Sequence, residues 1–155
     1  MTATMPTPTT FTLHSDLLGD IEMPEDAVLS FPEGLLGFPE CHRWALVDGA
    51  RSGTFWLQSL DHAPLAFLLL DPFQFFDDYA VEVAMRDRAR LDAAETNQVA
   101  VLAIVTLGKT IEEPCSVNLQ GPLLIDMAQR RGIQIILDDT RFGVRAPIAA
   151  QTLLS

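Results

Sequence analysis

The chain is poor in positive charge. Its 155 residues hold 10 Lys and Arg against 21 Asp and Glu, a formal net charge of −11. A surface of that sign repels phosphate backbones, so the composition disfavours direct nucleic-acid binding and favours a basic protein as partner. Residues 1–85 contain 13 acidic side chains and only Arg43 and Arg51, whereas residues 86–155 contain eight side chains of each sign. The acidic excess therefore lies in the first 85 residues, as a solvated surface or as a contact for a basic partner.

Cysteine and histidine are also scarce. Cys41 and Cys115 lie far apart without metal-ligand spacing, so they indicate neither a disulfide framework nor a zinc site. Three histidines offer few general bases, and no serine-hydrolase elbow, zinc-protease helix or phosphate-binding loop occurs. Cys41 and His42 are neighbours, but on a strand they would point to opposite faces and could not act as a pair. We expect a protein that is not an enzyme and needs no metal or organic cofactor.

Long apolar runs are absent as well. No run approaches the ~20 residues that span a bilayer, and the Thr- and Pro-rich start has no signal-peptide pattern. We expect a cytoplasmic protein without a membrane partner. With 48% hydrophobic residues, the chain is long and apolar enough for one globular domain. We place that domain at residues 11–147, after a disordered lead-in over 1–10 and before a C-terminal tail over 148–155.

Short alternating or apolar segments, separated by Gly and Pro turns, dominate the sequence. They predict a mainly β fold, a single antiparallel β-barrel or sandwich with one short helix over residues 86–96. A turn is expected over residues 118–122. The expected strands cover residues 11–14, 18–22, 27–31, 43–47, 54–60, 65–70, 79–83, 99–106, 123–126 and 133–137.

The most strongly punctuated stretch is Phe-Pro-Glu-Gly-Leu-Leu-Gly-Phe, residues 31–38, which we call the 31–38 corner. Its proline fixes φ and cannot donate a hydrogen bond, and its two glycines can adopt conformations closed to residues with a Cβ. The chain should bend here and bring two phenylalanine rings toward a shared core. No group in it can serve as an activated nucleophile, so we expect a structural role. The residues that define it are Phe31, Pro32, Gly34, Gly37 and Phe38.

A second notable stretch, residues 71–79, mixes four aromatic rings with three carboxylates, and we call it the acidic-aromatic segment. Aromatic anchors beside carboxylates suit a basic or amphipathic partner. Alternatively, the rings fill one end of a barrel and the carboxylates form a solvated turn. A Ca²⁺ site is disfavoured because the 12-residue glycine-containing loop is missing. The candidate contact residues are Asp71, Phe73, Phe75, Phe76, Asp77, Asp78 and Tyr79, with Glu112 and Glu113 as further candidates.

The 31–38 corner resembles the opening signature of the flagellar assembly factor family FliW, and three further motifs of that family follow in order. The sequence departs from the family pattern at Gly121, where Ala is usual, at Asp126, where Asn is common, and at Phe142, which replaces Tyr. The three motifs are Trp56-Leu57-Gln58-Ser59-Leu60, an apolar run over residues 67–73 closing on Asp71-Pro72-Phe73, and Asn118-Leu119-Gln120-Gly121-Pro122.

This resemblance implies a cytoplasmic binding protein with two partners. One is flagellin, and the other is CsrA, a translational regulator that binds messenger RNA leaders and represses flagellin synthesis. Holding CsrA off RNA when flagellin is scarce would couple flagellin synthesis to assembly. The alternative from another class is a small-molecule-binding β-barrel or an enzyme built on one, for which an apolar cavity with convergent polar groups would be the sign.

Overall fold

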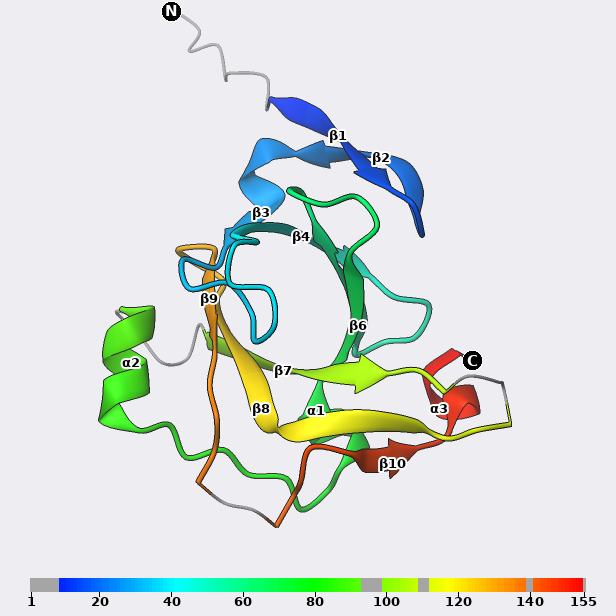
Figure 1. Ribbon diagram of the computed structural model, residues 1–155, viewed down its shortest axis with the longest axis vertical. Helices are drawn as coiled ribbons and strands as arrows, with labels where there is room; N and C mark the ends of the chain where they lie inside the picture. The colour runs from blue at the N-terminus through cyan, green and yellow to red at the C-terminus, as the bar shows by residue number, and fades with distance from the viewer. Residues whose placement is uncertain (1–8, 93–98, 109–111, 139–140, 155) are drawn as a thin grey trace, which may run out of the picture.

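The computed structural model describes residues 9–92, 99–108, 112–138 and 141–154, and in this part of the chain seven strands close into a barrel (Figure 1). Around the ring the order is β8-β7-β6-β5-β4-β3-β9, and β9 pairs back onto β8. Neighbours are antiparallel except β3 and β9, which meet in parallel at Ser30 and Arg131. The barrel strands are β3 (Val28–Ser30), β4 (Arg43–Asp48), β5 (Thr54–Ser59), β6 (Ala66–Leu70), β7 (Val99–Thr106), β8 (Cys115–Asp126) and β9 (Arg131–Gln134).

The other elements decorate this ring. A separate hairpin packs beside it, and β10 adds to β8 on the outside (Figure 1). None of the helices in the described ranges is long and apolar enough to cross a membrane. These elements are β1 (Thr10–Ser15), β2 (Gly19–Pro24), the 3-10 helix η1 (Glu25–Ala27), α1 (Pro72–Phe75), α2 (Met85–Leu91), β10 (Ala146–Ile148) and α3 (Ala150–Leu154).

The mainly β prediction is confirmed, but two expectations about single elements were wrong and a third, the helix, was wrong only in its bounds. Residues 118–122 are not a turn between strands, because β8 continues through them. Residues 79–83 form no strand although their side chains alternate. The expected helix over 86–96 begins at Met85 and ends at Leu91, where Asp92 takes a left-handed conformation with φ 54°; residues 93–96 lie outside the described part. We expected one short helix, and the structure contains the short helices η1, α1 and α3 in addition to α2.

The barrel has two cores, one inside the ring and one on its outer face. Leu69 of β6 packs into the inner core while its neighbours Leu68 and Leu70 pack into the outer one. Because β6, β7 and the end of β8 are buried on both faces, they read as nearly continuous apolar runs rather than alternating ones. The inner core holds Leu29, Phe31, Leu35, Cys41, Trp44, Leu57, Leu69, Leu102, Leu123 and Ile125. The outer core is covered by α1, α2, α3 and the segment over residues 76–84, which runs outside the ring in Figure 1.

The 31–38 corner behaves as expected. Gly34 and Gly37 have φ of +67° and +88°, a region that a Cβ disfavours. Phe31 is wholly buried and meets Trp44 edge-on, with ring centroids 6.4 Å apart. Phe38 meets another ring of the same core, that of Phe67, at 5.6 Å. The corner therefore inserts one aromatic ring into the barrel and rests a second beside it.

An ion pair fastens the corner to α2. Arg90 donates from Nε to Glu33 Oε2 at 3.1 Å and from a terminal nitrogen to Asp87 Oδ1 at 2.8 Å. The hydrogen bond to Glu33 is the main reason that the pKa of Arg90 is raised. Gln134 of β9 adds a neutral contact, because its Oε1 accepts from the Leu36 N–H at 2.9 Å. The corner is thus held by the helix and strand beside it.

Candidate partner-binding site

The acidic-aromatic segment begins where β6 ends. Asp71 caps α1, because its Oδ1 accepts from the Phe73 N–H at 3.0 Å and its Oδ2 accepts from the Gln74 side chain at 3.0 Å. Pro72 fits the first helical turn, where its missing N–H costs nothing. The Asp-Pro pair therefore stops the strand and starts the helix, and the Asp71 carboxylate is committed to hydrogen bonds within the chain.

The four rings of the segment differ in exposure. Phe73 is 48% exposed, and its ring centroid lies 5.5 Å from that of Tyr79. Phe75 and Phe76 are half-buried against the outer core. Asp77 and Asp78 are exposed. One aromatic ring and two carboxylates of the segment thus face solvent, while the other rings hold α1 against the barrel.

Tyr79 is the structural centre of the segment. It is 6% exposed, and its hydroxyl donates to the Leu119 carbonyl at 2.7 Å. The ring also meets Phe142 edge-on at 4.8 Å. Burial raises the pKa of the phenol to about 12, because the charged form would lose its hydration. Tyr79 therefore stays neutral and ties the segment to β8.

Arg51 links α1 to α3. Its guanidinium carbon lies 5.4 Å from the centroid of the Phe75 ring, and one of its nitrogens donates to the Thr152 carbonyl at 2.6 Å. Glu112 and Glu113 are exposed and line a different hollow, of about 480 Å³, with Pro114 and the start of α3. That hollow is lined by none of residues 71–79. The structure thus keeps residues 71–79 close to one another and places Glu112 and Glu113 at a separate hollow.

The remaining signature residues build the fold. Gln58 is buried; its Oε1 accepts from the Ser15 hydroxyl at 2.6 Å and its Nε2 donates to the carbonyl of Ala63 at 2.9 Å, which fixes the hairpin to the barrel. Asn118 Oδ1 accepts from the Gly121 N–H at 2.8 Å, inside a register shift of β8 against β7. The hydrogen bond between Asn118 and Gly121 explains how β8 can continue through a sequence that looks like a turn.

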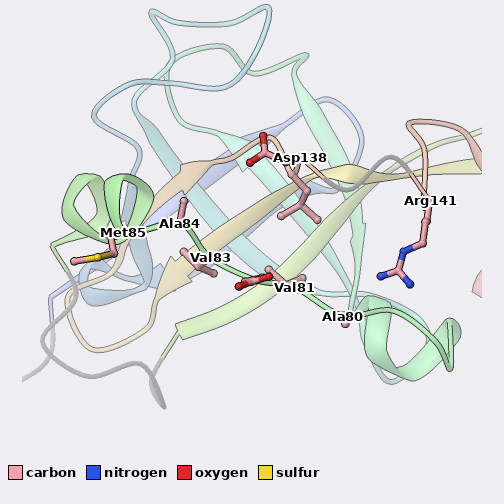
Figure 2. Close-up of a pocket in the computed structure, with 9 residues that line it drawn as sticks. Ala80, Val81, Val83, Ala84, Met85, Asp138 and Arg141 are labelled. Atoms are coloured by element: carbon pink, nitrogen blue, oxygen red, sulfur yellow. The ribbon is translucent and has the colours of Figure 1, made fainter.

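A groove that the sequence analysis missed lies next to the segment. It has a volume of about 560 Å³ and is lined by residues 80–85, Leu137, Asp138 and Arg141. In Figure 2 the residues from Ala80 to Met85 follow one side and Asp138 stands opposite. Arg141 lies at the Ala80 end in the same view. The sequence signal for this groove is the alternating pattern of residues 79–83, although that pattern predicts a paired strand.

Three other kinds of site, namely a metal site, a Cys-His pair and a small-molecule cavity, are not supported by the described ranges. No three His, Cys, Asp or Glu side chains of those ranges come together as a metal site. Cys41 is buried, whereas His42 is exposed with its Nε2 2.8 Å from the Pro39 carbonyl oxygen. The barrel interior, where a small molecule would bind, is filled by side chains such as Trp44 and Leu57.

Comparisons with known proteins agree with this architecture. A family model described as FliW protein matches residues 12–148. The flagellar assembly factor FliW of Natranaerobius thermophilus is 37% identical over 137 residues, covering 88% of this chain and 91% of that protein. The protein of the same name from Treponema denticola is 32% identical over 139 residues, covering 90% and 94%. A solved structure, described as the crystal structure of the flagellar assembly factor FliW, aligns with a TM-score of 0.78 at 27% identity and covers 90% of this chain and 96% of that one.

The barrel, its signature motifs and these matches define the class, a flagellar assembly factor rather than an enzyme. The chain belongs to the FliW family.

Proposed function

We propose that this chain binds a CsrA-type translational regulator and flagellin in the cytoplasm, and that it couples flagellin synthesis to assembly. When flagellin is scarce, the chain holds the regulator away from messenger RNA. When flagellin accumulates, it occupies the chain and frees the regulator to repress synthesis. Partner exchange of this kind requires that each ligand lowers the apparent affinity of the other.

The observation that carries the proposal, beyond family membership, is the exposed ring of Phe73 beside the exposed carboxylates of Asp77 and Asp78. An aromatic anchor with charges at its rim is what a basic or amphipathic partner requires. The formal charge of −11, concentrated in the first 85 residues, supports attraction of an RNA-binding, basic regulator. Glu112 and Glu113 are candidates for a second contact on the hollow beside α3.

The experiment compares ring and charge variants against the regulator and the flagellin of the same organism. Phe73→Ala should speed dissociation from at least one partner and weaken binding by about 2 kcal/mol, because it removes the exposed anchor. The matched control is Phe75→Ala, whose ring is half-buried against the outer core. That variant should lower the melting temperature and leave the affinity of the folded protein unchanged.

Charge is tested in the same way. Asp77→Lys combined with Asp78→Lys should slow association and blunt its dependence on salt, because rim charges mainly guide encounter. The control is Glu25→Lys with Asp26→Lys, which changes the net charge equally on the exposed η1 helix. Parent kinetics in every folded variant of the segment would remove it from the binding surface.

A further inference from the structure

Residues 80–83 present an open polypeptide edge. The segment lies between α1 and α2, and its side chains alternate: Val81 and Val83 pack against the outer core while Ala80 and Glu82 are exposed. Among the described residues, the main-chain N–H and C=O groups of these four make no hydrogen bond. Extended backbone with unpaired groups is the template to which another strand adds.

The opposite wall offers a second open edge. The N–H groups of Ile135 and Leu137 donate to the carbonyls of Pro122 and Gln120. Since successive residues of an extended chain direct their main-chain groups to opposite sides, those of Ile136 and Asp138 face away from β8. Within the described ranges they too have no main-chain partner. The groove of about 560 Å³ between the walls lies in the range of ligand sites, roughly 300 to 1,000 Å³.

The pattern of the open edge determines what an added strand must carry. In a β-ladder, directly opposite residues place their side chains on the same face. Residues opposite Val81 and Val83 would therefore face the outer core and should be apolar. Residues opposite Glu82 would face solvent beside its carboxylate, with Asp138 on the other wall, and should be basic. Arg141 lies at one end of the groove, and its guanidinium carbon is 5.2 Å from the Phe142 ring centroid.

We propose that this groove binds an extended polypeptide segment of a partner protein by strand addition to residues 80–83, and that the segment alternates apolar and basic residues. Main-chain pairing supplies the orientation, and the two carboxylates select for positive charge. This site is distinct from the exposed Phe73 surface and does not depend on which partner that surface holds.

The test uses the full chain and a capped peptide, Lys-Val-Lys-Val-Lys-Val. Hydrogen exchange of the free protein should show fast exchange at the amides of residues 80–83. The peptide should slow exchange at alternate amides of this stretch by about tenfold or more, because an added strand hydrogen-bonds only the groups that face it. Two matched peptides serve as controls: one with alternate amides N-methylated, which keeps the side chains but loses the donors, and Glu-Val-Glu-Val-Glu-Val, which reverses the charge. Neither should bind comparably.

Protein variants separate charge from fold. Glu82→Lys with Asp138→Lys should weaken the Lys-Val peptide by roughly tenfold, since two attractions become repulsions. Glu25→Lys with Asp26→Lys should not, and melting curves verify that both variants fold. Equal binding of the N-methylated or acidic peptide, binding without protection of residues 80–83, or no binding at about 1 mM would each overturn the proposal. Protection that grows with protein concentration and no peptide would assign the groove to a second copy of the chain, and would overturn it as well.

Discussion

Gly34 and Gly37 allow a sharp test of how the 31–38 corner is built, because they share a backbone conformation but differ in surroundings. Both have φ in the left-handed region, at +67° and +88°. A Cβ on Gly34 would lie 2.5 Å from the Phe38 carbonyl oxygen and 2.6 Å from the Pro39 Cα. A Cβ on Gly37 would meet nothing within 4 Å. Alanine at the two positions therefore separates strain from overlap.

The expected magnitudes follow from those two effects. A left-handed conformation costs an alanine about 1–2 kcal/mol, offset by about 0.4–1 kcal/mol gained from a less flexible unfolded chain. Gly37→Ala should thus lower stability by about 1 kcal/mol. Gly34→Ala adds an overlap with backbone atoms that cannot rotate away, worth about 1–3 kcal/mol, for a total of about 2–4 kcal/mol.

Thermal unfolding measures both variants. For a chain of this size 1 kcal/mol corresponds to a melting-temperature shift of about 2–4 °C, so Gly37→Ala should melt about 2–4 °C lower and Gly34→Ala about 4–16 °C lower. Gly37→Asn is the control, because asparagine tolerates the left-handed region better and should lose less than alanine. Equal shifts for the two alanine variants would refute the overlap argument, and parent-like melting of both would show that the corner does not organise the fold.

Two further predictions concern buried aromatic rings. Tyr79 is the single tyrosine of the chain, so phenolate absorbance should titrate near pH 12 instead of the ordinary value of about 10. The stability from its neutral form is complete below pH 10 and is lost as the pH rises toward 12. Tyr79→Phe should abolish this loss of stability at high pH. At neutral pH it should lower the free energy of unfolding by about 1 kcal/mol, since the Leu119 carbonyl loses its donor. Half-ionisation of the phenol near pH 10 would contradict the burial of Tyr79. Gly132→Ala would place a Cβ 2.5 Å from the Phe31 ring. Denaturant unfolding should show a loss of about 1–3 kcal/mol in stability. If the losses from Gly132→Ala and Phe31→Leu simply add in the double variant, the two sites do not interact.

The strands that local pattern predicts well are those whose burial is decided by their own side chains. Residues 99–105 are all apolar, and together with Thr106 they form β7 with the expected bounds. β8 was harder, because the Asn118 to Pro122 stretch contains turn residues and its continuity depends on distant partners. The N–H groups of Leu119 and Gln120 both donate to the Gly143 carbonyl, at 3.1 Å each. No pattern within residues 118–122 contains that information.

The candidate site shows the same limit. The alternation of residues 79–83 was visible in the sequence, but whether a strand pairs depends on the position of another segment. Likewise, the acidic-aromatic composition of residues 71–79 was evident, while the exposure of Phe73 and the burial of Tyr79 follow from how α1 packs on the barrel. The composition of the segment is visible in the sequence, but which of its rings are exposed and which are buried is decided by tertiary packing.

Partner exchange is tested most directly by mixing the purified chain with the CsrA-type regulator and the flagellin of its own organism and measuring the masses of the complexes after size-exclusion chromatography. The proposed function predicts one complex with each protein, and predicts that added flagellin releases the regulator from the preformed regulator complex. Failure to form either complex, or a stable assembly that retains both partners at undiminished affinity, would contradict it.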